Sequence, residues 1–179
     1  MNILKFFFIS IFMVLLGNIN AQATVVDVFA RANSSTGGSG AVTGVNVAIG
    51  DRLVMVTDPN DCWSAGAPPR DSNANGLTAG NPCPNGGIFP DWTQAGVSAP
   101  FGSLMGKIGA GNFFFVGTDF DQVMAEAGAL LLYYWDSNAG DNTEFVSVDI
   151  SLNPDLPAPG TLGLIGLGLG FLLYRRRKS

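Results

Sequence analysis

The sequence has 179 residues, 47% of them hydrophobic, with nine basic residues, 14 acidic residues and no histidine. This length suits one domain with a hydrophobic core, together with targeting segments. The absence of histidine excludes Ser-His-Asp and Cys-His nucleophilic catalysis and the usual histidine-containing zinc sites of hydrolases. Any acid–base chemistry would depend on carboxylates, as it does in glycosidases.

The first 23 residues are typical of a signal peptide. Lys5 precedes an apolar stretch at residues 6–16, and Ala21-Gln22-Ala23 provides the small-x-small pattern of a signal peptidase site. We expect cleavage after Ala23, with Ala21 as the second choice. An N-terminal anchor is the alternative, but the apolar stretch is shorter than the roughly 20 residues that span a membrane.

The body of the chain, residues 24–155, is strongly acidic. Five of the nine basic residues lie in the terminal segments, so the body holds four basic residues against all 14 acids, a net charge of −10. Such a surface repels phosphate backbones, and we expect no nucleic-acid partner. It suits a hard cation such as calcium, which takes oxygen ligands.

Alternation of apolar and polar residues predicts β-strands through most of the body. Segment 24–30 is rich in β-branched residues, and segments 44–49 and 53–57 alternate on either side of Gly50-Asp51, which predicts a hairpin. Further strand-like segments follow at 101–109, 113–117, 127–135 and 143–152. About eight strands and no convincing amphipathic helix predict an all-β, jelly-roll-type β-sandwich.

Residues 58–99 lack this periodicity and are expected to form a long loop. Cys62 and Cys83 both lie in it, and an isolated pair of cysteines in an exported protein is expected to form a disulfide. Trp63 and Trp92 also lie in the loop, and exposed rings there would suit stacking on a sugar. Packing of these rings against the sandwich is the alternative.

A short segment of this loop, Asp71-Ser-Asn-Ala-Asn-Gly76, fits the opening of a calcium loop. Oxygen ligands at alternate positions are followed there by a glycine that allows a sharp turn. Pro82 stands where a bidentate acid is expected. A metal-free turn rich in Asn and Gly is therefore an equal alternative.

The C-terminal segment 156–179 has three parts in a fixed order. Pro157-Ala158-Pro159 comes first, an apolar run from Leu162 to Tyr174 follows, and Arg175, Arg176, Arg177 and Lys178 form a basic end. We expect the run to be a short transmembrane helix whose basic end stays in the cytoplasm. A buried core helix is the alternative, but it explains neither the basic cluster nor the terminal position.

This segment resembles the PEP-CTERM sorting signal, the substrate tag of exosortase-type enzymes in Gram-negative bacteria that make exopolysaccharide. Ala158 replaces the glutamate of the Pro-Glu-Pro motif. The resemblance implies an exosortase-type enzyme as partner, export through the inner membrane and transient anchoring by the C-terminal helix. The final location would be the cell surface or the extracellular matrix.

The body resembles another family in segments 44–55, 102–109, 115–120, 128–136, 141–142 and 145–150. These segments are similar to the calcium-dependent galactophilic bacterial lectins and the wider galactose-binding-like sandwich family. In those lectins one calcium ion bridges protein and sugar hydroxyls. The resemblance assigns Asp136, Asp141 and Asn142 as metal ligands, and Asp136, Asn142 and Asn75 as sugar contacts. The alternative is an Asp/Asn-rich hairpin whose side chains satisfy nearby backbone amides.

Together these observations predict an exported, non-enzymatic protein whose sandwich binds carbohydrate, such as matrix polysaccharide, through calcium. One alternative is a structural or adhesive protein of a matrix or biofilm that has no sugar site. The other is a carboxylate-dependent glycosidase, which has only the abundance of acids in its favour.

Overall fold

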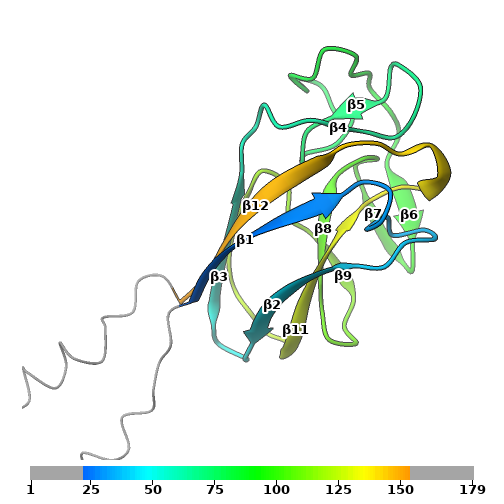
Figure 1. The fold of residues 1–179 in the computed structure, drawn as a ribbon. Helices are drawn as coiled ribbons and strands as arrows, with labels where there is room; N and C mark the ends of the chain where they lie inside the picture. The colour runs from blue at the N-terminus through cyan, green and yellow to red at the C-terminus, as the bar shows by residue number, and fades with distance from the viewer. Residues whose placement is uncertain (1–21, 154–179) are drawn as a thin grey trace, which may run out of the picture. The chain divides into compact units, whose positions relative to one another are not determined.

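A computed structural model describes residues 22–153 of the chain. They form two four-stranded antiparallel sheets, with strand orders β1-β12-β3-β10 and β2-β11-β8-β9 (Figure 1). The first sheet contains β1 (Gln22–Phe29), β12 (Phe145–Leu152), β3 (Arg52–Thr57) and β10 (Asp119–Val123). The second contains β2 (Ala41–Val47), β11 (Gly128–Tyr134), β8 (Leu104–Ile108) and β9 (Phe113–Phe115).

The order of these eight strands identifies the fold. Counted along the chain, the first, eighth, third and sixth of them make one sheet, and the second, seventh, fourth and fifth make the other. Two four-stranded antiparallel sheets connected in this way are a jelly roll. The predicted all-β, jelly-roll-type sandwich is confirmed.

The core lies between the two sheets and follows directly from the alternation in the sequence. Successive side chains of a strand point to opposite faces, and β2 accordingly alternates between buried and exposed residues along its whole length. The largest aliphatic side chains that are fully buried in this core are Leu53, Met55, Leu104, Ile108, Leu130, Leu132 and Ile150.

The predicted hairpin around Gly50-Asp51 is wrong. Strand β2 pairs with β11, whereas β3 pairs with β12 and β10, so the turn crosses from one sheet to the other. Alternation reveals which face of a strand is buried but not which strand lies beside it. Strand β10 was not predicted, because this edge strand is mostly exposed and carries two aspartates among its five residues.

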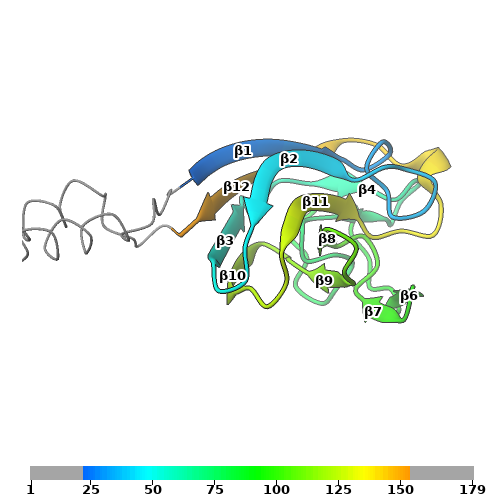
Figure 2. The same ribbon diagram turned by 90° about the horizontal axis from the view of Figure 1, so that it is seen from below.

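The register of β1 and β12 defines two ends of the sandwich. Gln22 pairs with Leu152 at one end, and Phe29 pairs with Phe145 at the other. The antiparallel registers place the turns after β2, β8 and β10 at the Gln22 end (Figure 1; β10 is labelled in Figure 2). The remaining connections, residues 30–40, 58–103, 116–118 and 135–144, gather at the Phe29 end.

The long connection between β3 and β8 contains two small two-stranded sheets. They are formed by β4 (Trp63–Ser64) with β5 (Asp71–Ser72), and by β6 (Trp92–Gln94) with β7 (Val97–Ala99). The hairpin of β6 and β7 lies beside β9 (Figure 2). Its side chains form a second hydrophobic cluster on the outer face of the sheet, around Met105 and Trp135.

Most of the two predicted targeting segments lies outside the described residues. This applies to the signal peptide up to residue 21, and to the predicted tail at 156–179 with its helix at 162–174. Gln22 and Ala23 are described and form the start of β1. Between residues 22 and 153, no helix is both long and apolar enough to span a bilayer.

Candidate functional site

Asp136 lies just beyond the end of β11, where hydrogen bonds with two other segments hold the backbone. Its backbone N–H donates to Ser35 Oγ over 3.3 Å, and the Ser35 hydroxyl donates to the Asp136 carbonyl over 3.2 Å. The neighbouring Trp135 N–H donates to the carbonyl of Ser103 over 2.9 Å. These contacts fix the backbone that carries the Asp136 carboxylate, and the residue is only 2% exposed.

Asn142 reaches the same region from the start of the chain segment that leads into β12. It follows a single 3₁₀ turn, η1 (Ala139–Asp141), whose N-cap is Asn138. Its side-chain amide donates to the carbonyl oxygen of Ala30 over 3.1 Å, and the residue is 2% exposed. The side chain is thereby fixed against the end of β1.

The two buried side chains leave two oxygen atoms without hydrogen-bond partners among the described residues. These atoms are Asp136 Oδ2 and Asn142 Oδ1. Burial raises the pKa of Asp136, and the charge of Asp141 acts in the same direction, whereas the Asn142 amide and the N–H groups of Asn138 and Ser137 lower it. A buried oxygen without a partner costs free energy, so both atoms are suited to receive a ligand.

Asp141 lies nearby, but its carboxylate already has partners. Asn138 donates from Nδ2 to Asp141 Oδ1 over 2.9 Å, and Arg70 Nη1 lies 3.7 Å from Asp141 Oδ2. The two side chains of the ion pair are 43% and 45% exposed. We call the group formed by Arg70, Asp136, Asp141 and Asn142 the Asp136 corner.

The position of Asp141 also depends on Gly66. Gly66 has φ of +113°, and a Cβ built there would overlap Asp141 Oδ2. The backbone of Gly66 therefore provides the surface on which the carboxylate rests. The loop that contains Gly66 is joined to the segment just before β12 by paired backbone hydrogen bonds between Ser64 and Thr143, both 3.1 Å long.

The donor set fits a calcium ion in part. Calcium takes carboxylate and amide oxygens, and Asp136 Oδ2 and Asn142 Oδ1 are such atoms, buried and without partners. Asp141 would supply the second carboxylate, with the Arg70 guanidinium beside it. Among residues 22–153, no three His, Cys, Asp or Glu side chains cluster in a way that would hold a metal. A cation here would therefore depend on a pair of carboxylates and an amide.

Asn75 is engaged elsewhere at this end of the sandwich. Its Oδ1 accepts from the N–H of Thr118 and its Nδ2 donates to Thr118 Oγ1, each over 3.0 Å. Both polar atoms therefore stabilise the turn between β9 and β10. A sugar contact of Asn75 would have to use the second lone pair of Oδ1 or the second hydrogen of Nδ2.

The calcium-like opening at residues 71–76 is likewise held by contacts within the protein. Asn73 donates to the carbonyl of Pro59 over 2.8 Å and accepts from the N–H of Asn75 over 3.0 Å. Asp71 Oδ2 accepts from Asn85 Nδ2 over 3.0 Å. A calcium ion in this segment would have to compete with these internal partners, and both the calcium loop and the metal-free turn stay predictions.

The stacking role predicted for Trp63 does not fit its position, and this prediction is corrected. Trp63 is 1% exposed, its Nε1 donates to the carbonyl of Gly102 over 2.9 Å, and its ring packs edge-on against Tyr134 with centroids 4.4 Å apart. Neither face of the ring is available to a sugar. The indole belongs to the core, because the loop folds back onto the sandwich after Asp61.

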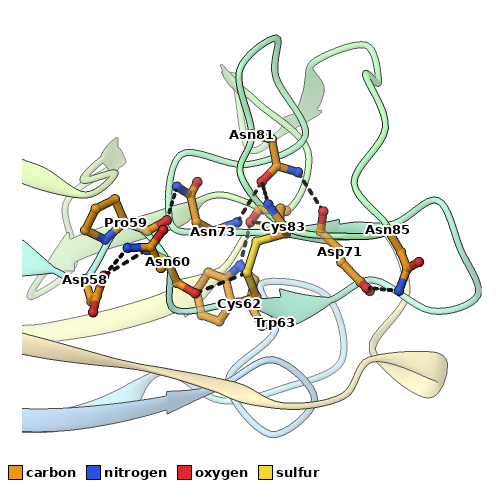
Figure 3. The surroundings of a disulfide bond; sticks show 12 residues. Asp58, Pro59, Asn60, Cys62, Trp63, Asp71, Asn73, Asn81, Cys83 and Asn85 are labelled. Carbon is orange, nitrogen blue, oxygen red and sulfur yellow. Dashed lines mark hydrogen bonds between the residues drawn. A yellow bond between two sulfur atoms is a disulfide. The ribbon is translucent and has the colours of Figure 1, made fainter.

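The loop is closed by a disulfide between Cys62 and Cys83, the pair chosen from the sequence, with Cα atoms 6.0 Å apart (Figure 3). Asn81 lies beside it, donates to the carbonyl of Asp71 over 2.7 Å and accepts from the N–H of Cys83 over 3.2 Å (Figure 3). The disulfide and these bonds hold the segment that carries Arg70 near the sandwich.

Sequence reasoning missed Arg70 and Gly66. Both lie in the stretch without periodicity, where strand patterns give no positional information. Arg70 does have one signal in the sequence, because it is the single basic residue between Arg52 and Lys107 in a strongly acidic body. Gly66 has no signal, since its role depends on a contact with a residue 75 positions later.

A search of curated protein sequences gave no match. One solved structure, described as the EclA N-terminal domain and as a PllA-like lectin, aligns with 18% sequence identity and a TM-score of 0.48. The alignment covers 73% of this chain and 94% of that one. The jelly-roll assignment depends on the strand order of the present chain and not on this likeness.

The sorting segment is also matched by a family model. Residues 155–178 match the model described as the PEP-CTERM protein-sorting motif. The matched range contains Pro157, Ala158 and Pro159 as well as Arg175, Arg176 and Arg177, the residues selected for this role from the sequence. The chain therefore carries a PEP-CTERM protein-sorting motif, an export and anchoring signal, behind a jelly-roll β-sandwich.

Proposed function

We propose that this protein is an exported, non-enzymatic protein whose β-sandwich binds carbohydrate through a calcium ion at the Asp136 corner. The observation that supports this most is the pair of buried oxygens without partners, Asp136 Oδ2 and Asn142 Oδ1. A bound calcium ion would supply a positive centre to which vicinal sugar hydroxyls can be attached. The chain's own residues would hold the ion and orient it toward the loops.

The proposal includes the route of the protein. The PEP-CTERM motif at residues 155–178 supports export and C-terminal anchoring. We infer that an exosortase-type enzyme processes the tail and that the sandwich then acts at the cell surface or in the extracellular matrix. A matrix exopolysaccharide is the glycan that it would meet there.

Calorimetric titration of the full-length chain in detergent with calcium chloride tests the metal site. We expect saturable binding that Asp136→Asn abolishes. Asp149→Asn is the matched control, because Asp149 is an exposed acid on the outer face of β12 and its substitution changes the net charge by the same amount. Equal calcium binding by the wild type and by Asp136→Asn would contradict the assignment.

A glycan array with and without a calcium chelator tests the second half of the proposal. We expect binding to a restricted set of glycans that the chelator removes. Calcium binding without any glycan signal would leave a metal-stabilised sandwich and refute the lectin function.

A structural or adhesive matrix protein is the second candidate. It is favoured by the contacts that already join the loops without any ligand, Arg70 with Asp141 and Asn142 with Ala30. In this case Asp136→Ala leaves biofilm behaviour unchanged, whereas removal of residues 156–179 abolishes it. The glycosidase alternative has less support, because Asp136 is 2% exposed and the Asp141 carboxylate pairs with Arg70.

A further inference from the structure

Arg70 places a fixed positive charge beside the carboxylate that the proposed calcium ion would also use. Its Nη1 lies 3.7 Å from Asp141 Oδ2 and 3.5 Å from the carbonyl oxygen of Ala65. Its guanidinium carbon lies 5.9 Å from the centre of the Phe89 ring. One of these contacts joins the guanidinium to Asp141, and the other two hold it against its own long connection between β3 and β8.

The ion pair itself contributes little to folding. Both side chains are more than two-fifths exposed, and the separation of 3.7 Å is long for a charge-assisted hydrogen bond. Exposed pairs of this kind have small effects on stability. The main consequence of Arg70 is thus electrostatic, and it acts on the charge balance of the corner.

Arg70 and a bound cation would both interact with the carboxylate of Asp141. Asp136 Oδ2 and Asn142 Oδ1 have no partners, but Asp141 Oδ2 faces the guanidinium. A divalent ion on this oxygen either displaces Arg70 or binds beside a guanidinium that repels it. Both effects weaken cation binding.

We propose that Arg70 competes with calcium for Asp141 and thereby lowers the calcium affinity of the Asp136 corner. This inference rests on the proposed calcium site. It gives the corner an internal cation that neutralises Asp141 when no metal is bound.

Calcium titrations of full-length wild-type protein, Arg70→Gln and Arg52→Gln at constant ionic strength test the inference. Arg70→Gln removes the charge and keeps a polar, shorter side chain. Arg52→Gln is the matched control, because Arg52 also pairs with an aspartate, Asp121, but lies near the Gln22 end of the sandwich. We expect Arg70→Gln to bind calcium about tenfold more tightly than the wild type and Arg52→Gln to bind as the wild type does.

The outcomes separate this inference from the function on which it rests. Equal or weaker calcium binding by Arg70→Gln, in a wild type that does bind, overturns the competition and leaves the calcium site standing. No binding by any variant overturns both. A double-mutant cycle with Asp141→Asn adds a second criterion, since competition requires the gain from Arg70→Gln to disappear when Asp141 is replaced. A gain that persists in this background overturns the role of Asp141.

Calcium-induced shifts of the unfolding midpoint provide a readout that is independent of any glycan. At a fixed millimolar calcium concentration we expect a larger stabilisation of Arg70→Gln than of the wild type, because ligand stabilisation grows with affinity. The calcium-free midpoints also show whether each variant is folded.

Discussion

Gly66 and Asp141 are in direct contact, and a side chain at position 66 would overlap the Asp141 carboxylate. Gly66→Ala is therefore expected to displace Asp141, to add strain at a φ of +113° and to lower the free energy of unfolding by about 1–3 kcal/mol. Urea denaturation measures this cost. Gly50→Ala is the control, because Gly50 also has a positive φ, +91°, but has open space around a Cβ. Equal costs at both positions would show that the contact with Asp141 has no energetic effect.

Trp63 is expected to matter for stability and not for glycan contact. Trp63→Ala removes a fully buried indole and its hydrogen bond to Gly102, so we expect a loss of about 3–5 kcal/mol in the free energy of unfolding. Trp63→Phe should lose less, because the ring contact with Tyr134 is retained. A Trp63→Ala variant that keeps its stability but loses glycan binding would contradict the buried assignment.

The disulfide is expected to stabilise the long loop. It closes a loop with a sequence separation of 21, which corresponds to about 3 kcal/mol in the chain-entropy treatment. A Cys62→Ser/Cys83→Ser double variant should lose about that much free energy of unfolding, seen as a lower denaturant midpoint, and reductant should no longer affect the midpoint. If reduction leaves the wild-type midpoint unchanged, the cross-link does not contribute to equilibrium stability.

Asp136 is expected to lower the stability of the calcium-free protein while it serves the proposed calcium site. Its carboxylate is buried with Oδ2 lacking a partner, so removal of the charge should stabilise the calcium-free protein by about 1 kcal/mol. Thermal unfolding of Asp136→Asn in the presence of a chelator checks this. Destabilisation instead would mean that the carboxylate has a structural role in the corner.

The ion pair of Arg52 and Asp121 predicts a small acid dependence. The hydrogen bond from Arg52 lowers the pKa of Asp121, so the pair contributes stability above the unfolded pKa and loses it as the pH falls through the folded value. Asp121→Asn should therefore reduce the change in unfolding midpoint between neutral pH and about pH 3. The effect is small because the pair is exposed, and an identical acid dependence in the variant would show that the pair does not contribute.

The sequence allowed the architecture to be predicted wherever burial follows alternation. Val45 and Val47 alternate in the sequence and are both buried in the core, and the jelly-roll class follows from such segments. Strand pairing could not be predicted in the same way, because a two-residue period contains no information on the neighbouring strand. The turn at Gly50-Asp51 is the example. Strand β10 was missed because its exposed aspartates do not resemble a strand pattern.

Some residues of the candidate site could be predicted from the sequence and others could not. Asp136 and Asn142 follow and precede strands, and a resemblance in those strands was enough to select them. The positions of Arg70 and Gly66 depend on the path of a long loop that a disulfide and buried Trp63 fix in space. A path of this kind is decided by contacts between residues far apart in the sequence, so local patterns could not predict it.

The pairing of Gln22 with Leu152 places both ends of the described chain at one end of the sandwich. Strand β1 runs from this pair toward the Ala30 carbonyl that holds Asn142, a path of about 26 Å for an eight-residue strand. A change made at residue 22 or 153 would therefore lie about one strand length away from the Asp136 corner.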